Sequence, residues 1–347
     1  MSQAIGRKLR VLVVDDSLFM RAAIAKLLVA DGRFEVVGQA RDGAEGVDMA
    51  VQLGPDVVTM DFNMPRMNGA EAVRALMSKR PTPVIMFSAH TQQGARETFE
   101  ALAAGAVDFV TKPSGEVSAD LSAIRADLSA KLLAAAQARP RALAPVRSAK
   151  PGPEAFSSTW PPSGPRVLTI GVSTGGPAAL SRVIPSLPAT MRLAVVVVQH
   201  MPRSFTTTLA ERLNGLSAVS VREAQEGERP IAGTVLIAPG DRHLEFTDAG
   251  AVRLTDDGPV NGCRPAADVT MRSAAQVFGR RAMGLVMTGM GKDGTAGLRA
   301  IRERQGTTLA QGQHSCVIYG MPKAAIDAGV VDEVLELDKI AGRLTEL

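Results

Sequence analysis

Short apolar runs alternate with helix-like segments along almost the whole chain, and this alternation restricts the fold more than any other feature of the sequence. Ser17, for example, is placed to cap a helix whose apolar residues recur every three to four positions from Met20 to Leu28. Five strand–helix units of this length predict a doubly wound α/β domain with a parallel sheet. The strand-like runs are 9–14, 35–37, 56–60, 84–87 and 107–111, and later helix-like segments are 43–53, 69–79, 91–103 and 118–136.

The C-terminal part alternates in the same way and predicts a second doubly wound parallel sheet. A β-rich patch at 219–255 interrupts the alternation, and we expect an antiparallel hairpin insertion there. The strand-like runs are 167–170, 193–198, 235–238, 285–287 and 307–310, and the helix-like segments lie near 176–186, 204–214, 266–278, 294–303 and 321–328.

A proline-rich stretch at 139–165 separates these two parts. It has no apolar periodicity, and each proline lacks an amide donor and disfavours helix in the residue before it. With 347 residues, the chain also exceeds the ~250–300 residues at which single cores stop growing. We therefore predict a domain at 1–138, a linker at 139–165 and a second domain at 166–347.

Charge and hydropathy exclude several classes of protein. The net charge is only +4, aromatic residues are 3%, and much of the basic excess falls in the proline-rich stretch, so a nucleic-acid-binding face is not indicated. The longest apolar run, Leu193 to Val198, is far too short for a membrane helix of ~20 residues, so no membrane insertion is expected. Two cysteines cannot form a disulfide framework, and no secretory signal begins the chain. We expect a cytoplasmic protein.

Polar residues follow four strands of the first predicted sheet. Asp15 and Asp16 come after the first strand, Asp61 after the third, Ser88 after the fourth and Lys112 after the fifth. Ligands of open α/β sheets bind at the carboxyl ends of strands, so these side chains should meet there. Clustered carboxylates suit Mg²⁺, and a carboxylate can accept a phosphoryl group.

The stretches VLVVDDS, VVTMDFNMPRMNG, VIMFSAHT and VDFVTKP, which fall within residues 9–130, resemble the landmarks of response-regulator receiver domains. The resemblance implies that a histidine kinase phosphorylates Asp61. It also implies that Mg²⁺ binds Asp15, Asp16, Asp61 and the main-chain carbonyl of Asn63. Many relatives carry an acidic residue where Asn63 stands. By the same resemblance, Ser88 and Lys112 sense the phosphoryl group and Phe109 is the switch aromatic residue.

Three residues in the second domain have the chemistry of a catalytic triad. Ser173 lies in a glycine-rich turn between a strand and a helix, His200 directly follows an apolar strand, and Asp293 lies in a glycine-rich loop after another strand. A serine needs a base to remove its proton, and the base needs an anion to fix its tautomer. Because Gly171 to Gly175 also fits a nucleophile elbow, a triad in the order serine, acid, histidine stays open, with Asp241 and either His243 or His314.

The stretches GVSTGGP, VVVVQHMP, LIAPGDRHL, CRPAADV, TGMGKDG and AQGQHSCVIYGMPKAA resemble the catalytic domain of the chemotaxis protein-glutamate methylesterases. The resemblance implies that Ser173, His200 and Asp293 form the triad, and that the amides of Thr174 and Met290 form the oxyanion hole. Arg264 and Asp268 match a stretch that lines the cleft, while Cys263 and Cys316 resemble packing residues.

The combined resemblance implies a phosphorylation-activated enzyme of sensory adaptation. Its substrates are glutamate 5-methyl esters, and glutamines to be deamidated, on methyl-accepting chemotaxis receptors. A chemotaxis histidine kinase is the implied phosphodonor, Mg²⁺ is needed for phosphorylation, and no cofactor is expected for the ester chemistry. The alternative is a non-catalytic receptor-docking or signalling scaffold with a receiver domain.

Overall fold

The computed structural model describes residues 7–112, 122–138 and 166–347. The chain divides into two compact units between Ala144 and Pro145. The predicted linker at 139–165 lies outside the described residues, so its boundaries stay a prediction. Among the helices that the structure describes, none has both the length and the apolar character needed to cross a membrane.

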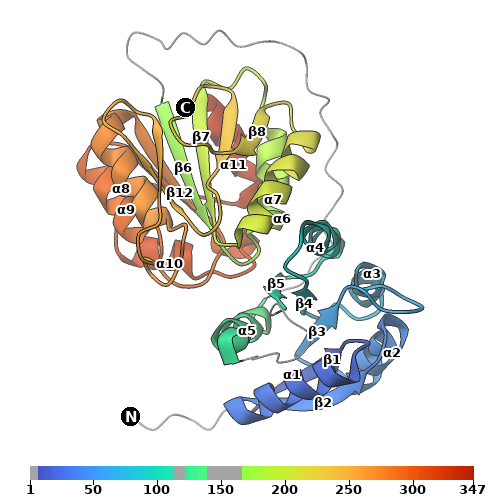
Figure 1. The fold of residues 1–347 in the computed structure, drawn as a ribbon. Coiled ribbons are helices and arrows are strands. Elements are labelled where there is room, and N and C mark those ends of the chain that lie inside the picture. The colour runs from blue at the N-terminus through green and yellow to red at the C-terminus, as the bar shows by residue number, and fades with distance from the viewer. Residues whose placement is uncertain (1–6, 113–121, 139–165) are drawn as a thin grey trace, which may run out of the picture. The chain divides into compact units, whose positions relative to one another are not determined.

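The first unit is a five-stranded parallel sheet with the strand order β2-β1-β3-β4-β5. Helices α1 and α5 lie on one side of this sheet, and α2, α3 and α4 lie on the other (Figure 1). The elements are β1 (Leu9–Val14), α1 (Leu18–Asp31), β2 (Phe34–Ala40), α2 (Gly43–Leu53), β3 (Val57–Asp61), α3 (Gly69–Lys79), β4 (Val84–Ser88), α4 (Gln92–Ala104), β5 (Asp108–Thr111) and α5 (Ser122–Ala135).

Local sequence signals set the helix ends of this unit. The Ser17 side chain accepts a hydrogen bond from the Met20 amide and caps α1, as predicted. Asn68 and Glu71 form a reciprocal capping box at the start of α3, immediately after the loop that follows Asp61. The fixed start of α3 therefore limits the freedom of that loop.

The second unit is a seven-stranded parallel sheet with the order β14-β13-β12-β6-β7-β9-β8. Helices α8 and α9 cover one face, and α6, α7 and α11 cover the other (Figure 1). Its strands are β6 (Arg166–Val172), β7 (Leu193–Gln199), β8 (Ser220–Glu223), β9 (Thr234–Ile237), β12 (Ala282–Val286), β13 (Thr307–Gln311) and β14 (Glu333–Leu335). Its α-helices are α6 (Gly176–Val183), α7 (Arg203–Leu216), α8 (Ala267–Phe278), α9 (Thr295–Glu303), α10 (Met321–Asp327) and α11 (Leu337–Glu346).

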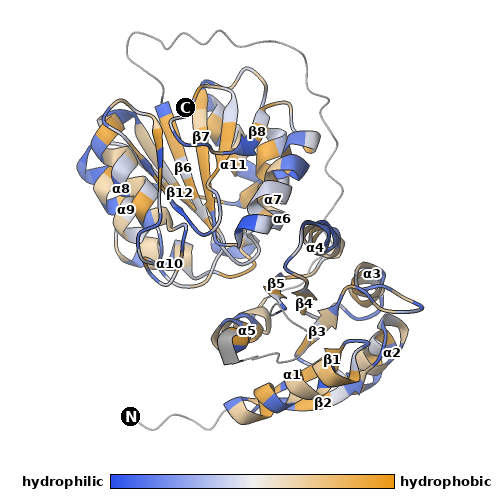
Figure 2. Cartoon of the chain, viewed as in Figure 1, coloured by the Kyte–Doolittle hydropathy of each residue, from blue (hydrophilic) through white to orange (hydrophobic). Residues whose placement is uncertain are grey.

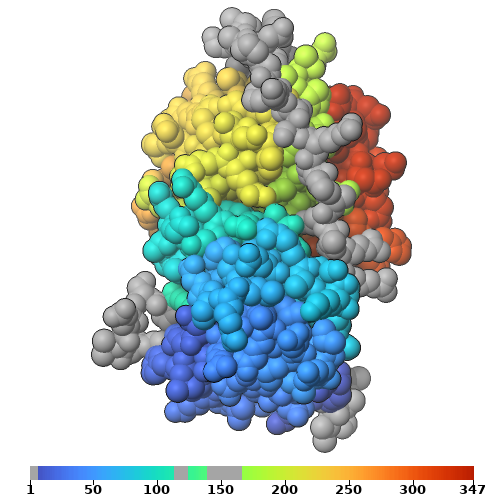
Figure 3. Space-filling model, turned by 90° about the vertical axis from the view of Figure 1, so that its right-hand side faces the viewer, coloured from blue at the N-terminus to red at the C-terminus, as the bar shows by residue number. Residues whose placement is uncertain are grey.

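An antiparallel hairpin of β10 (His243–Phe246) and β11 (Val252–Thr255) stands apart from this sheet. The segment from β8 to β10, coloured yellow in Figure 3, forms much of the surface of the second unit in that view. The two parallel sheets and the antiparallel insertion confirm the predicted fold class.

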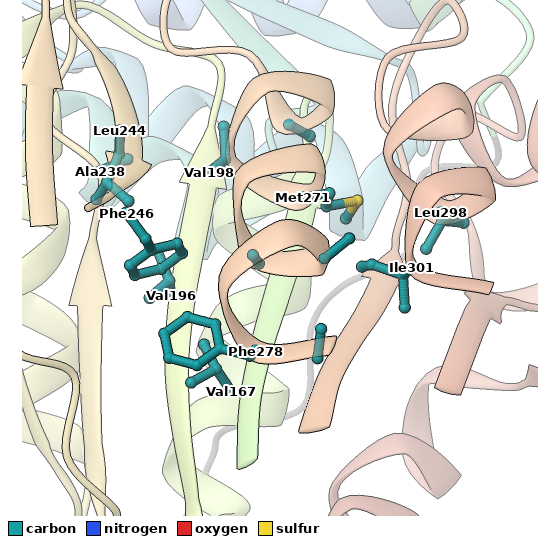
Figure 4. Close-up of a cluster of buried hydrophobic side chains, with 14 of the residues drawn as sticks. Val167, Val196, Val198, Ala238, Leu244, Phe246, Met271, Phe278, Leu298 and Ile301 are labelled. Atoms are coloured by element: carbon teal, nitrogen blue, oxygen red, sulfur yellow. The ribbon is translucent and has the colours of Figure 1, made fainter. Parts of the chain in front are cut away.

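The core of the second unit explains why its central strands are apolar throughout. All residues of β7 and β12 are buried, and Figure 2 shows β6, β7 and β12 as mostly hydrophobic strands between amphipathic helices. Met271 of α8 lies toward Leu298 and Ile301 of α9 (Figure 4). The rings of Phe246 and Phe278 meet edge to face at 5.0 Å, which packs the hairpin against α8.

Candidate functional site

Acidic residues and one lysine meet at the carboxyl end of the first sheet, as predicted. Oxygens of Asp15, Asp16 and Asp61 all lie within 4.8 Å of one another. The Lys112 ammonium reaches in from the end of β5, with its Nζ 3.1 Å from Asp15 Oδ2 and 2.9 Å from Asp61 Oδ2. Three hard oxygen donors at this separation fit a divalent cation such as Mg²⁺.

Asp61 is buried, and its surroundings change its basicity. Burial raises the pKa of Asp61 to about 6, helped by the nearby Asp15 charge and opposed by Lys112. Burial lowers the pKa of Lys112, but the charges of Asp61 and Asp15 outweigh this effect and raise it above its usual value. The lysine therefore stays charged beside the carboxylates.

The other residues predicted for this site have different partners. The Ser88 hydroxyl donates to the Gly94 carbonyl oxygen at 3.0 Å and accepts from Thr98 Oγ1 at 2.6 Å, so it is bonded to α4. Phe109 is buried, with Lys131 Nζ 5.3 Å from its ring centroid. The Asn63 side chain donates to Glu97 at 2.9 Å. Metal binding by its carbonyl stays a prediction.

Ser173, His200 and Asp293 follow three adjacent strands of the second sheet. Ser173 follows β6, His200 follows β7, and Asp293 lies in the loop after β12, while the sheet order places β6 between β12 and β7. His200 Nε2 lies 2.8 Å from Asp293 Oδ2. The topology thus brings a nucleophile, a base and an acid to one edge.

Backbone contacts fix the turn that carries Ser173. Its amide donates to the Thr288 carbonyl at 3.0 Å, and the amide of Gly176 donates to the Ser173 carbonyl at 2.8 Å. Gly175 has a φ of 77°, which favours glycine. A Cβ on Gly289 would lie 2.7 Å from Ser173 Cβ, so only glycine lets the next loop approach the serine this closely.

The second ring nitrogen of His200 faces a residue that the sequence did not assign to the site. Cys263 Sγ lies 3.5 Å from His200 Nδ1, and Cys263 is partly exposed. Its interpretation as a packing residue is therefore incomplete. Within the described part of the chain, no hydrogen bond joins the Ser173 hydroxyl to His200. Burial and Glu336 raise the pKa of the other thiol, Cys316, to about 12, as expected for a packing residue.

The surroundings of His200 and Asp293 favour a charged imidazole on His200. Burial lowers the pKa of His200, but hydrogen bonds and charges of Asp293 and Cys263 outweigh it and raise the pKa to about 9. Burial likewise raises the pKa of Asp293, but contacts with His200, Ala267 and Asn261 hold it below its usual range. Asp293 is therefore ionised and orients His200.

Asp293 lies against the amino end of α8. Its oxygens accept hydrogen bonds from the amides of Ala267, at 2.6 Å, and Asp268, at 3.1 Å. Free amides at a helix start stabilise an anion. The residue that precedes α9 as its N-cap is Gly294, so Asp293 does not cap the helix that follows it.

Thr174 and Met290 flank Ser173 on two loops. Among the residues that the structure describes, neither backbone amide has a hydrogen-bond acceptor. Thr288 links these loops, because its hydroxyl donates to the Thr174 carbonyl at 2.9 Å and its amide donates to Gln311 Oε1 at 2.8 Å. Sequence reasoning missed Thr288 and Gln311, although Thr288 begins the TGMGKDG stretch.

The alternative triad order does not match the geometry. His243 is buried, and its two ring nitrogens contact the Ala266 amide at 3.2 Å and the Gly258 carbonyl at 3.0 Å. His314 and Asp241 are exposed. Arg264 donates to the carbonyls of Asp256 and Asp257, so its contacts fasten a loop.

A cluster of three carboxylates and a lysine in one α/β unit, with a Ser, His and Asp set in the other, fits a response regulator with a hydrolase effector. Family models describe the two parts: a response regulator receiver domain matches residues 11–121, and a CheB methylesterase matches residues 168–344.

Full-length relatives specify the family. The chain is 46% identical to a protein-glutamate methylesterase/protein-glutamine glutaminase of Symbiobacterium thermophilum, over 99% of this chain and 98% of the relative. It is 45% identical to one from Pyrococcus abyssi, over 96% and 92%. The crystal structure of the Thermotoga maritima CheB methylesterase catalytic domain matches with a TM-score of 0.51 and 42% identity, covering 53% of this chain and 98% of that one. The chain belongs to the protein-glutamate methylesterase/protein-glutamine glutaminase family and is a hydrolase.

Proposed function

We propose that this protein removes methyl groups from glutamate 5-methyl esters, and ammonia from glutamines, on methyl-accepting chemotaxis receptors by serine catalysis. The observation that carries the proposal is the 2.8 Å pair of His200 and Asp293 beside the strand-end turn of Ser173. In this proposal residues 1–138 regulate residues 166–347 through the linker at 139–165, and the enzyme acts on the cytoplasmic part of the receptors.

The mechanism uses one base twice. Ser173 Oγ attacks the ester carbonyl carbon while its proton passes to His200. Because Nε2 faces Asp293, Nδ1 is the ring nitrogen that receives the proton. Methoxide leaves and takes that proton as methanol. Water, deprotonated by His200, then attacks the acyl-enzyme, and Ser173 leaves with that proton, so the product is a glutamic acid side chain that ionises to the carboxylate. With glutamine the leaving group is ammonia.

The oxyanion of each tetrahedral intermediate needs preorganised donors. We assign this role to the backbone amides of Thr174 and Met290, which lack acceptors in the described part of the chain. The bonds of Thr288 to the Thr174 carbonyl and to Gln311 hold the two loops at a fixed separation.

In the receiver, Asp61 accepts a phosphoryl group from a histidine kinase. Asp15, Asp16 and Asp61, with the Asn63 carbonyl, would hold Mg²⁺, which neutralises the carboxylates and the phosphoryl oxygens when bound. Lys112 supplies a further positive charge. Ser88 and Phe109 are the proposed switch residues that respond to the phosphoryl group.

We expect acetyl phosphate with Mg²⁺ to raise methanol release from methylated receptor membranes about tenfold, which corresponds to ~1.4 kcal/mol of differential interaction between receiver states. Asp61→Asn should keep the basal release and lose the stimulation, because an amide cannot accept the phosphoryl group. The measurement is radiolabelled methanol release by the full-length protein.

Two results would count against the proposal in different ways. Stimulation that persists in Asp61→Asn would remove Asp61 as the phosphoacceptor. No release by either folded protein, with binding to receptors retained, would support the non-catalytic scaffold instead.

We expect kcat/KM for ester hydrolysis to rise with pH up to about 9, because protonated His200 cannot accept the serine proton. Asp293→Asn removes the charge that raises this pKa. The increase of kcat/KM with pH should therefore occur at lower pH, while the maximum rate falls. Asp338→Asn, in the first turn of α11 and paired with Lys339, is the control and should leave the pH dependence of kcat/KM unchanged. An unshifted pH dependence in Asp293→Asn would mean that another group controls the rate.

A further inference from the structure

The tight turn from Val260 to Cys263 lies beside the His200–Asp293 pair. Val260 and Cys263 exchange two backbone hydrogen bonds, of 3.1 and 2.9 Å. Asn261, at the first corner, has a φ of 54°, a left-handed conformation that asparagine tolerates better than most residues. The side chains of this turn contact both residues: Cys263 Sγ faces His200 Nδ1, and Asn261 contacts Asp293.

The Asn261 amide bridges two carboxylates. Its Nδ2 donates to Asp293 Oδ1 at 2.9 Å and to Asp268 Oδ2 at 2.9 Å. The other oxygen of Asp293, Oδ2, is the one that contacts His200. Asn261 therefore joins the amides of Ala267 and Asp268 in restricting the rotation of the carboxylate about its Cβ–Cγ bond, and it does so without touching the base.

Asp268 anchors this bridge to two helices. It is buried in the first turn of α8, and its Oδ1 accepts a hydrogen bond from the Gly297 amide of α9 at 2.7 Å. An amide group suits the position between Asp268 and Asp293, because its two hydrogens satisfy both anions while a carboxylate there would repel them.

We propose that Asn261 is a positioning residue that sets the orientation of the catalytic acid Asp293, with Asp268 as its anchor. The inference rests on the proposed Ser173–His200–Asp293 function. Asn261 acts through Asp293, so removing the Asn261 side chain should slow the chemical step. It should have this effect only when Asp293 is present.

A double-mutant cycle in the full-length protein tests this dependence. Asn261→Gly removes the amide and keeps the left-handed backbone, which glycine adopts readily. We expect kcat for methanol release to fall about tenfold with KM unchanged, the lower range for a lost hydrogen bond to a charged group, because Asn261 is itself exposed. In the Asp293→Ala background, Asn261→Gly should cause no further loss.

Asn214→Ala, which removes a side-chain bond to the Val221 amide far along the sheet, is the matched control and should leave kcat unchanged in both backgrounds. Asn261→Asp, which tolerates the left-handed backbone but can donate to neither carboxylate, gives a second variant if the glycine variant loses stability in thermal unfolding. Equal losses with and without Asp293, or a change confined to KM, would overturn the inference. Full activity of Asp293→Ala would overturn the proposed function instead.

Discussion

Replacing Ser173 with alanine is expected to reduce kcat for methyl-ester hydrolysis by about four to six orders of magnitude, the range seen when a serine hydrolase loses its nucleophile. The expected residual rate comes from substrate binding and from the donors of the oxyanion hole, which do not depend on the hydroxyl. The measurement is methanol release under phosphorylating conditions, with the initial rate normalised to folded protein.

The alanine variant should keep its fold, which makes the rate loss interpretable. The turn is held by main-chain bonds of residue 173, since its amide donates to Thr288 and its carbonyl accepts from Gly176 and from Gln199 Nε2. None of these bonds uses the hydroxyl. Ser186→Ala, which removes an exposed hydroxyl bonded to the Arg182 carbonyl, is the control and should retain full activity. Substantial hydrolysis by Ser173→Ala would exclude a serine acyl-enzyme.

The meeting of these side chains at each sheet edge could be predicted from the sequence, because each of them follows the end of a strand. Asp15, Asp61 and Lys112 meet because β1, β3 and β5 are parallel and end at one edge of the sheet. The pairing of His200 with Asp293, 93 residues apart, follows from the same rule in the second sheet. A position at the end of an apolar run is a local signal, so it can be recognised in the sequence alone.

The residues that support the sites carry no such signal. Asn261 and Thr288 act through hydrogen bonds to residues 32 and 114 positions away, and only the folded chain defines these contacts. The contact of Cys263 with His200 likewise depends on where the folded chain places the turn at 260–263. For Ser88 the sequence predicts the position at a strand end. Its hydrogen bonds to Gly94 and Thr98 depend on the packing of α4 and could not be predicted.

The edge of the second sheet was also missed. Strand β14 has only three residues, all partly or largely exposed, so it has neither an apolar run nor a clean alternation. It pairs with β13 in register Leu309 with Glu333, and α11 follows it directly. Pairing with an existing strand, not the intrinsic preference of these residues, produces this strand.

Replacing His200 with alanine should lower kcat by about as much as the serine variant, because the nucleophile and its base act as one unit and their losses are not additive. The double variant with Ser173→Ala should therefore be no slower than either single one. Among the described residues, His200 pairs with the ionised Asp293 through Nε2 at 2.8 Å, which leaves Nδ1 to accept the serine proton.

The absence of a Ser173–His200 hydrogen bond among the described residues does not weaken this expectation. Catalytic hydrogen bonds in unliganded enzymes are often long and tighten when substrate binds. Here Nδ1 faces the Cys263 thiol at 3.5 Å, and because a thiol is a weak donor we expect the serine hydroxyl to displace this contact when substrate binds. The ring therefore needs no change of its bond to Asp293 to accept the serine proton.

His314→Ala is the matched control, since His314 is exposed and lies on the loop after β13. It should retain near wild-type methanol release. A large loss in His314→Ala with activity retained in His200→Ala would instead select the serine, acid, histidine order. Comparing the two variants in one assay separates the two triads, because a true base should cost orders of magnitude while an exposed histidine should cost little.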